Sequence, residues 1–211
     1  MIRRSFVGLF GGTFDPVHKG HLAMAAHFLE HVQFDTLYFI PAADPPHKCA
    51  VIPASERLCM LKLALVGLAS CKVSDIELER NGPSYTIDTL RSMRLSYPDA
   101  ALVFVLGADA FATLSTWHEW QSLLNYAHLW VMPRAGVVLS GEMSAYYRAH
   151  ACFDREQLSR APSGMIYWSK QTVSSLSSTQ LRAQLCAGLD CHNDLPPATY
   201  AYIKQHHLYR S

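Results

Sequence analysis

Two histidines three positions apart, His18 and His21, follow a pair of glycines at Gly11 and Gly12. Residues at this spacing lie on one face of an α-helix, so both imidazoles can contact the same ligand. Imidazole N–H groups and the unpaired backbone N–H groups of a helix N-terminus both donate hydrogen bonds to phosphate oxygens. These residue types in this pattern therefore predict a binding site for a polyphosphate.

The flanking residues predict a strand, a tight turn and a helix that would position the two histidines. Residues 6–10 form a short apolar run of the kind found in buried strands. Glycines at the end of a strand let the backbone turn sharply and approach a ligand closely. Apolar residues then recur at helical spacing at Leu22, Ala25, Ala26 and Leu29, and we expect the first turn of that helix to carry both histidines.

Other interpretations of the histidine pair are open on sequence alone. Histidines at this spacing also occur on exposed helix faces, and two histidines can be ligands of zinc. Zinc is disfavoured because Asp15 lies across Pro16 from the pair and no cysteine pair follows with finger-like spacing. The segment has neither the Gly-Lys-Ser/Thr of a Walker loop nor the G-x-G-x-x-G spacing of a dinucleotide loop. With the strand, the glycine pair and Gly20 in place, phosphate binding is the favoured interpretation.

Length and composition favour one α/β domain spanning residues 1–211. Half of the residues are hydrophobic, which is enough for a large core, and the net charge of +1 argues against a nucleic-acid-binding surface. Neither an 18-residue apolar run nor a signal peptide is evident, so we expect no membrane association. The six cysteines lack C-x-x-C spacing and are typical of reduced thiols in a cytoplasmic protein.

Strand and helix patterns alternate along the rest of the chain. The expected strands lie at residues 37–40, 73–78, 101–106, 128–132 and 165–168. The expected helices are one capped by Ser55, one over residues 86–96, one from a capping-box-like pattern at 177–180 to Gly188, and one after Pro197. Residues 137–163 show no clear pattern. The alternation predicts a doubly wound, mostly parallel sheet with ligands at the carboxyl ends of its strands.

Four polar clusters directly follow expected strands, where this architecture places its ligands. They lie at residues 44–48, 107–109, 133–134 and 174–182. Any one of their cations, such as Lys48 or Arg134, is by itself most simply a solvated side chain. Their shared position after strands is what favours a common site.

Residues 11–21 resemble the (H/T)xGH signature of the nucleotidyltransferase superfamily, and nearly the whole chain resembles the bacterial nicotinate-nucleotide adenylyltransferases. The resemblance rests on residues 11–21, 45–48, 84–86, 107–109, 117–120 and 176–182, the last matching I-S-S-T-x-[IL]-R with Leu176 first. It implies a Rossmann-like nucleotidyltransferase fold. It also implies transfer of the adenylyl group of ATP to nicotinate mononucleotide, giving nicotinate adenine dinucleotide (deamido-NAD) and pyrophosphate in NAD biosynthesis.

The resemblance implies a role for each matching residue. The catalytic set, which would hold the ATP phosphates, is His18, His21 and Arg182. The wider ATP-binding set is Gly11, Gly12, Thr13, Phe14, His18, Gly20, His21, Asp109, Ser177, Ser178 and Arg182. The mononucleotide-binding set is Lys48, Ser84, Tyr85, Thr86, Trp117 and Arg134. Mg²⁺ is expected to be held mainly by substrate phosphates and water, not by protein side chains.

Some positions depart from the family pattern or permit a structural role. Residues 41–43 read Pro-Ala-Ala where relatives often carry asparagine, and residues 132–136 around Arg134 differ from the common R-P-G pattern. Trp117 belongs to a Trp-x-x-Trp pair, which suits a core position as well as stacking on a planar ring.

Related functions would share several of these residues. An adenylyltransferase acting on nicotinamide mononucleotide or pantetheine phosphate, or a glycerol-phosphate cytidylyltransferase, would share residues 11–21. A nucleotide sensor without catalytic activity would share the fold. The joint presence of His18, His21 and Arg182 favours an enzyme, and a homo-oligomer is compatible with the sequence.

The sequence also bears on how a nicotinate carboxylate would be told from an amide. The basic residues near 84–86 and 117–118 are Arg80 and Arg91, so we expect backbone N–H groups to receive the carboxylate. Ser84 and Thr86 mark the start of one helix, and residues 117–118 are expected to open a second, short one.

Overall fold

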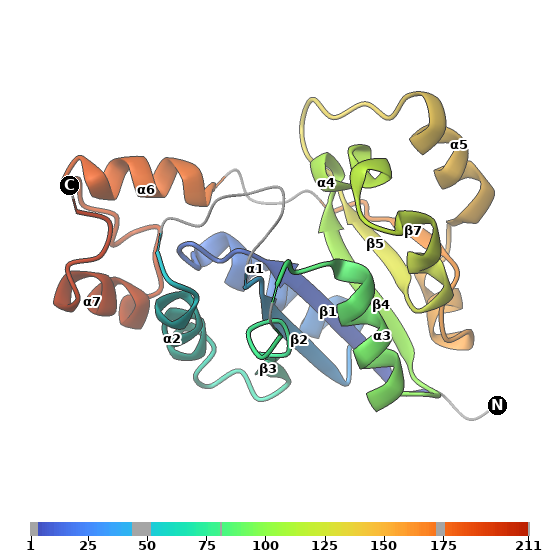
Figure 1. Cartoon of the computed structure of the whole chain (residues 1–211), viewed down its shortest axis with the longest axis horizontal. Coiled ribbons are helices and arrows are strands. Elements are labelled where there is room, and N and C mark those ends of the chain that lie inside the picture. Colours follow the sequence, from blue (N-terminus) through green and yellow to red (C-terminus); the bar gives the residue numbers. More distant parts are fainter. Residues whose placement is uncertain (1–3, 44–51, 81, 172–175, 211) are drawn as a thin grey trace. The chain divides into compact units, whose positions relative to one another are not determined.

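The computed structural model describes residues 4–43, 52–80, 82–171 and 176–210. Its strands form a seven-stranded parallel sheet in the order β3-β2-β1-β4-β5-β7-β6 (Figure 1). The strands are β1 (Phe6–Gly12), β2 (Thr36–Pro41), β3 (Cys71–Val73), β4 (Ala101–Gly107), β5 (His128–Met132), β6 (Ala151–Cys152) and β7 (Ile166–Trp168). The chain moves outward from β1 in one direction and then, from β4, in the other. The predicted doubly wound fold is therefore confirmed.

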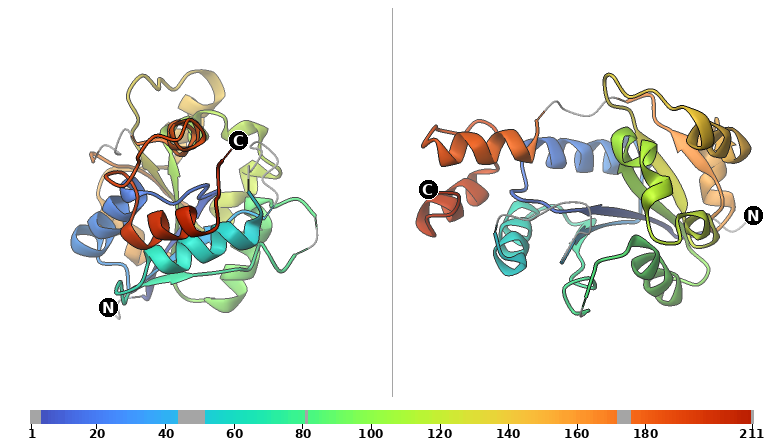
Figure 2. Two further views of the ribbon diagram at one scale, coloured as in Figure 1. Left: turned by 90° about the vertical axis from the view of Figure 1, so that its left-hand side faces the viewer. Right: turned by 45° about the horizontal axis from the view of Figure 1, so that its top comes forward.

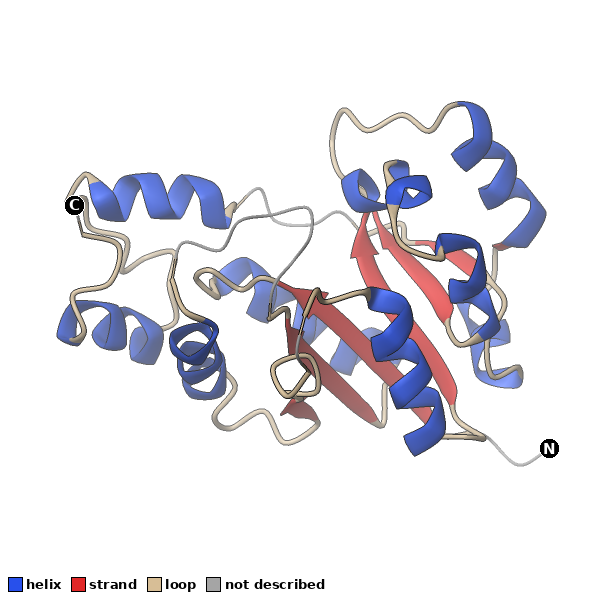
Figure 3. Cartoon of the chain, viewed as in Figure 1, coloured by secondary structure: helices blue, strands red, loops and turns tan. Residues whose placement is uncertain are grey.

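Helices alternate with these strands (Figure 3). The α-helices are α1 (Lys19–His27), α2 (Ala54–Ala64), α3 (Thr86–Ser96), α4 (Ala108–Ala112), α5 (Gly141–His150), α6 (Ser178–Cys186) and α7 (Pro197–Gln205). A π-helical turn, η1 (Phe28–Val32), extends α1, and 3-10 turns occur at η2 (Leu114–Thr116), η3 (Trp120–Asn125) and η4 (Arg155–Arg160). Within the described ranges, no helix has the length and apolar character needed to cross a membrane.

The chain forms two compact units, each assembled from separate segments. Unit 1 consists of residues 1–11, 34–38 and 85–173, and unit 2 consists of residues 12–33, 39–84 and 174–211. Each unit is described by itself below. The expectation of a single domain over residues 1–211 stays a prediction.

The apolar strand β4 forms part of the buried core of unit 1. It pairs in parallel with β1 through Phe6↔Ala101 to Phe10↔Val105, and with β5 through Val103↔His128 to Gly107↔Met132. Residues 101–106 are all buried, as expected for a strand with both faces covered. Helix α3, which lies across one face of this part of the sheet (Figure 1), buries Ile87, Leu90 and Met93, the apolar face that the sequence predicts.

Unit 2 contains α1 and α2 from the first part of the chain and α6 and α7 from its last part. Helices α2 and α7 lie side by side (Figure 2). Two hydrogen bonds join these helices. Thr199 Oγ1 donates to the Met60 carbonyl at 3.4 Å, and the Tyr202 hydroxyl donates to Glu56 Oε2 at 2.9 Å. Helix α7 begins at Pro197, a residue whose fixed φ suits the first helical position.

The structure corrects two predicted segment boundaries. Strand β3 ends at Val73, because the N–H groups of Leu78 and Glu79 donate to the Asp75 carbonyl and form a turn in place of a strand. Ser55 is not the N-cap of α2. The N–H groups of Glu56 and Arg57 donate to the Pro53 carbonyl, so the helix already includes Ser55.

Two predicted helix starts also differ in detail. Ser177 is the N-cap of α6, as expected, but its side chain makes no capping hydrogen bond, so the capping box does not form. Residues 117–118 do not open a helix. The second short helix, η3, starts at Trp120, and Glu119 precedes it in a left-handed conformation with φ of 48°.

Residues 137–163, for which the sequence shows no pattern, form α5, the short strand β6 and the turn η4. Strand β6 has two residues and pairs with β7 at the edge of the sheet. A strand this short offers no alternation of apolar and polar residues for sequence reasoning to detect.

Candidate active site

The histidine pair lies at the N-terminus of α1 in unit 2. His18 is the N-cap residue and His21 lies in the first turn, with their rings stacked at a centroid distance of 3.8 Å. The backbone N–H of His18 donates to Nδ1 of His21 at 3.2 Å. An accepting Nδ1 carries no proton, so the neutral His21 ring has its proton on Nε2 and is a donor there.

His18 is held in its neutral form by burial. Its side chain is 5% exposed, and the loss of hydration lowers its pKa to about 4, against a smaller opposing effect of Asp194. Its Nδ1 atom is buried and has no hydrogen-bond partner among the described residues. A buried polar atom without a partner is unusual in a folded protein, and here it lies at a helix start that the sequence predicts to bind phosphate.

The loop between β1 and α1 is fixed by glycine and aromatic packing. A Cβ atom on Gly12 would lie 3.0 Å from the Phe14 ring, so a larger residue would fit only if that ring shifted. Phe14 is buried with φ of 50°, and its ring meets that of His21 edge-on at 5.1 Å. In unit 1, a Cβ on Gly11 would lie 3.1 Å from the Phe104 ring. Gly20 is buried within α1.

Hydrogen bonds from distant residues hold the carbonyl groups of the same loop. Arg57 Nη1 donates to the Thr13 carbonyl at 2.7 Å, Arg182 Nη1 to the Asp15 carbonyl at 2.7 Å, and Ser178 Oγ to the Pro16 carbonyl at 3.1 Å. These contacts bring Ser178 and Arg182 of α6 to the segment that leads into His18. The structure therefore brings together the predicted catalytic residues of unit 2.

Asp15 is a fully buried carboxylate inside this loop. The Tyr209 hydroxyl donates to its Oδ1 at 2.6 Å, and burial together with this hydrogen bond raises the pKa of Tyr209. Arg182 Nη1 lies 3.9 Å from Oδ2. The positive charge of Arg182, whose side chain is 22% exposed, therefore lies at the surface of the loop while the carboxylate lies inside it.

Sequence reasoning missed Arg57 and Tyr209. Arg57 is 1% exposed, and burial lowers its pKa while Asp15 opposes that shift. Its guanidinium also donates to the Ala43 carbonyl at 3.2 Å, so it fixes the ends of two strands. An arginine within a helix and a tyrosine near the C-terminus carry no local signal of these contacts.

A second group of predicted residues lies in unit 1. Asp109, in the first turn of α4, pairs with Arg134 at 2.8 Å, and both side chains are 48% exposed. A Cβ on Gly107 would lie 2.4 Å from Asp109 Oδ1, so glycine is required for this carboxylate position. The structure thus joins one predicted ATP contact to one predicted mononucleotide contact.

The residues expected to receive a nicotinate ring are also in unit 1. Thr86 is the first residue of α3 and Tyr85 is its N-cap, as the sequence predicts. Trp117 is half-buried and meets the Phe104 ring edge-on at 6.4 Å, while the rings of Tyr85 and His118 lie 4.5 Å apart. In unit 2, Ser84 Oγ accepts a hydrogen bond from the Ala43 N–H at 3.0 Å. Lys48 lies outside the described residues.

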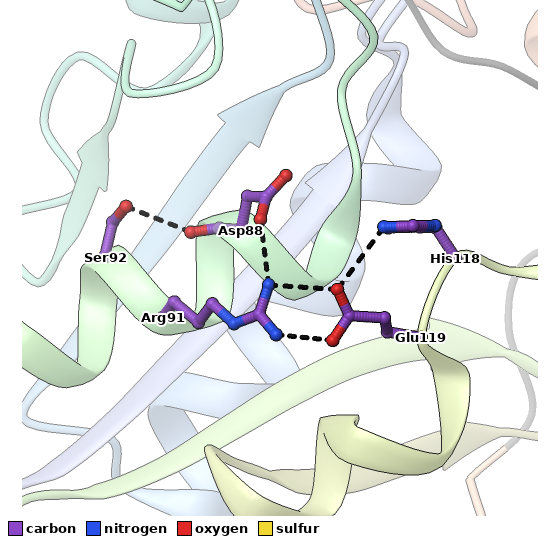
Figure 4. Close-up of polar contacts among 5 residues, drawn as sticks. All are labelled: Asp88, Arg91, Ser92, His118 and Glu119. Carbon is purple, nitrogen blue, oxygen red and sulfur yellow. Dashed lines mark hydrogen bonds and ion pairs between the residues drawn. The ribbon is translucent and has the colours of Figure 1, made fainter.

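Arg91 connects α3 to the segment at 117–119 (Figure 4). Its Nη1 donates to Asp88 Oδ1 at 3.2 Å and to Glu119 Oε1 at 3.3 Å, and its Nη2 donates to Glu119 Oε2. His118 Nε2 lies 3.4 Å from Glu119 Oε1. Hydrogen bonding to Glu119 raises the pKa of Arg91 and lowers that of Glu119. The guanidinium is therefore directed at protein carboxylates.

A parallel sheet with a glycine loop and two stacked histidines at a helix N-terminus is typical of nucleotide-binding proteins of the α/β class. The sequence matches the family model described as cytidylyltransferase-like over residues 9–184. It is 40% identical over 209 residues to a probable nicotinate-nucleotide adenylyltransferase of Pseudomonas aeruginosa, covering 97% of each chain. It is 38% identical over 205 residues to one of Idiomarina loihiensis, covering 95% of this chain and 98% of the relative.

The chain therefore belongs to the nicotinate-nucleotide adenylyltransferase family within the cytidylyltransferase-like proteins. Its fold is similar to that of the Plasmodium falciparum nicotinic acid mononucleotide adenylyltransferase complexed with NaAD, with a TM-score of 0.73, 18% identity and 97% of each chain covered. That likeness concerns the fold. The resemblance seen in the sequence motifs is confirmed.

We expect buried His18 to make stability depend on pH. Its pKa is about 4 in the folded state against 6.5 in the unfolded state, so stability is complete above pH 6.5 and falls as pH drops toward 4. The full loss is roughly 3 kcal/mol, from 1.36 kcal/mol per pKa unit. His18→Gln should remove this contribution and leave that of His128, which is also buried with a lowered pKa, so the loss between pH 7 and 4.5 in urea unfolding should become smaller.

The matched control for this measurement is His31→Gln, because the His31 side chain is 51% exposed. That variant should lose as much free energy of unfolding between pH 7 and 4.5 as the original protein does. An unchanged pH dependence in His18→Gln would contradict the burial argument.

Proposed function

We propose that the protein transfers the adenylyl group of ATP to nicotinate mononucleotide, releasing pyrophosphate and forming nicotinate adenine dinucleotide. The observation that supports this most is that Arg182 and Ser178 of α6 donate to the carbonyls of residues 15 and 16, which lead directly into His18 and His21 at the start of α1. This arrangement supplies neutral and cationic donors close together, as a polyphosphate requires.

The chemistry needs no covalent intermediate. An oxygen of the mononucleotide 5′-phosphate attacks the α-phosphorus of ATP, the bond to the bridging oxygen breaks, and pyrophosphate leaves with the electron pair. A phosphate anion is already a nucleophile, so no general base is required. The protein positions the two anions and stabilises the charge that builds on the leaving group.

The predicted site residues of each unit are assigned separately. In unit 2, His21 Nε2–H, the Arg182 guanidinium and the start of α6 at Ser177 and Ser178 are assigned to the ATP phosphates. In unit 1, Trp117 is assigned to stacking on the nicotinate ring and Asp109 to nucleotide hydroxyls. Because Arg134 is paired with Asp109, we assign it to holding that carboxylate as well as to the mononucleotide.

We also propose that Mg²⁺ accompanies the substrates. No group of three or more histidine, cysteine or acidic side chains with metal-binding geometry occurs among the described residues. The donors at the histidine loop suit phosphate oxygens, so Mg²⁺ would be held by those oxygens and by water, neutralising their charge. A cytoplasmic location, small-molecule substrates and a role without nucleic acid or membrane are part of the same proposal.

The central test is a pyrophosphate-release assay with ATP and a panel of mononucleotides. We expect turnover with nicotinate mononucleotide and Mg²⁺, and loss of turnover with EDTA. CTP in place of ATP should give no product. Binding of ATP by calorimetry with no turnover for any mononucleotide would identify a sensor, and efficient turnover with pantetheine phosphate would identify the alternative adenylyltransferase.

Substitutions at the histidine loop should act on the transition state more than on binding. We expect His21→Ala to lower kcat by about 10²- to 10³-fold, as for loss of one preorganised donor, with a much smaller change in the ATP dissociation constant. Arg182→Lys should also lower activity, because an ammonium group does not reproduce the guanidinium fork on phosphate oxygens. Calorimetric unfolding provides the control, since loss of the folded state by His21→Ala would indicate a core histidine instead.

The protein should use nicotinate mononucleotide better than the nicotinamide form. The rings have nearly the same shape, so the carboxylate must be recognised electrostatically, and Arg91 is already paired with Asp88 and Glu119 (Figure 4). We therefore expect backbone N–H groups at the start of α3 to donate hydrogen bonds to the carboxylate. The NH₂ group of the amide is itself a donor, so it would face other donors and pair badly. We expect discrimination of ~1–3 kcal/mol, about 5- to 150-fold in kcat/KM.

Arg91→Gln separates this explanation from direct binding by the arginine. If backbone donors receive the carboxylate, the variant should retain a preference for the acid. If the variant used the acid and the amide equally well, Arg91 would be the group that binds the carboxylate. Equal use of both substrates by the unaltered protein would contradict the anion site at α3.

A further inference from the structure

The C-terminal segment of unit 2 reaches the loop that carries the histidine pair. Tyr209 is 7% exposed, and its hydroxyl donates a 2.6 Å hydrogen bond to the fully buried Asp15 carboxylate. His207 and Tyr209 have φ values of 52° and 60°, a region that residues other than glycine rarely adopt. The backbone thus takes an unfavourable conformation where it brings the phenol to Asp15.

The same aspartate touches Arg182 in a different way. Arg182 Nη1 donates to the Asp15 backbone carbonyl at 2.7 Å but lies 3.9 Å from the carboxylate oxygen Oδ2. Arginine and a carboxylate within reach normally form close, often bidentate, hydrogen bonds. Here the phenol occupies one carboxylate oxygen, and the guanidinium is directed to the carbonyl and, through Nη2, to Thr179 Oγ1 at 3.3 Å.

Arg57, the other cation near Asp15, is also directed to carbonyl groups. Its Nη1 and Nη2 atoms donate to Thr13 and Ala43. Its charge acts on Asp15 only through space. Compared with Arg57 and Arg182, Tyr209 therefore makes the short hydrogen bond to a carboxylate oxygen of Asp15.

We propose that Tyr209 is a positioning residue for Arg182. By donating to the buried carboxylate, its hydroxyl keeps Arg182 on the Asp15 carbonyl and leaves the guanidinium charge available to the ATP phosphates. Arg182 and the Asp15 carboxylate already form a long ion pair at 3.9 Å. Without the hydroxyl, this pair shortens to a direct hydrogen bond, which competes with ATP for the same charge. This inference rests on the proposed role of Arg182 in ATP binding.

Tyr209→Phe removes the hydroxyl and keeps the ring. We expect the KM and the calorimetric dissociation constant for ATP to rise about 10-fold, the scale of one hydrogen bond to a charged group, with the KM for nicotinate mononucleotide unchanged. The matched control is Tyr200→Phe. The Tyr200 hydroxyl also donates to an aspartate, Asp190 at 2.8 Å, but at an exposed site, and its loss should leave ATP binding unaltered.

Removing the aspartate charge provides the rescue. In Tyr209→Phe with Asp15→Asn, no carboxylate is left to capture Arg182, so ATP affinity should return to within about threefold of the original value, a non-additive result. A purely structural tyrosine would give the opposite outcome. Tyr209→Phe would then lower the unfolding temperature without changing ATP affinity, and the second substitution would cause further loss.

Two outcomes keep this inference separate from the proposed function. Unaltered protein that binds ATP but makes no dinucleotide contradicts the proposed function and leaves the ATP-binding comparison intact. Equal ATP affinity in the unaltered protein and Tyr209→Phe overturns the positioning role. If Tyr209→Phe does not fold, the double variant decides, because ATP affinity more than about tenfold weaker than the original would overturn it as well.

Discussion

Burial of Asp15 among donors from distant parts of the chain is the constraint on which the proposed phosphate-binding loop depends. Removing a carboxylate from water costs at least several kcal/mol unless donors and cations surround it, so an ion with no exposed surface fixes its neighbours. Those neighbours come from distant parts of the chain, with Arg182 and Tyr209 lying 167 and 194 positions away. The loop that leads into α1 is therefore held by α6 and by the segment that follows α7. Its precision is a tertiary property, although its sequence looks like a local motif.

The same distances explain what the sequence could and could not predict. Strand β4 and helix α3 have apolar patterns repeated over six or more residues, and both were predicted to within a residue or two of their observed bounds. The histidine pair was found because glycines and helix signals lie beside it. Arg57 acts through contacts 44 and 14 positions away and Tyr209 through one 194 positions away, and such contacts leave no periodicity to detect. The prediction that Ser55 caps α2 was wrong because the Pro53 carbonyl already accepts the first hydrogen bonds of that helix.

His18 and His21 belong to one motif but differ in burial and in hydrogen bonding. Rings 3.8 Å apart cannot both be protonated cheaply, and burial keeps His18 neutral well below neutral pH. His21 is oriented by the backbone N–H of His18, which donates to its Nδ1 atom. The loop therefore combines a neutral, buried His18 ring with the guanidinium groups of Arg57 and Arg182, which donate to its carbonyl groups.

Under the proposed assignment, the two units would recognise anions in different ways. In unit 2, Arg182 lies 3.9 Å from the Asp15 carboxylate, so its charge would remain for phosphate oxygens. In unit 1, Arg91 is engaged by Asp88 and Glu119, so a ligand carboxylate near Thr86 would meet backbone dipoles and not a side-chain cation. A mobile cation attracts any anion, including a second phosphate, whereas N–H groups fixed at a helix start donate well only to a group that fits between them. Neutralising Arg91 within the protein would thus favour selection of a small planar carboxylate over phosphate.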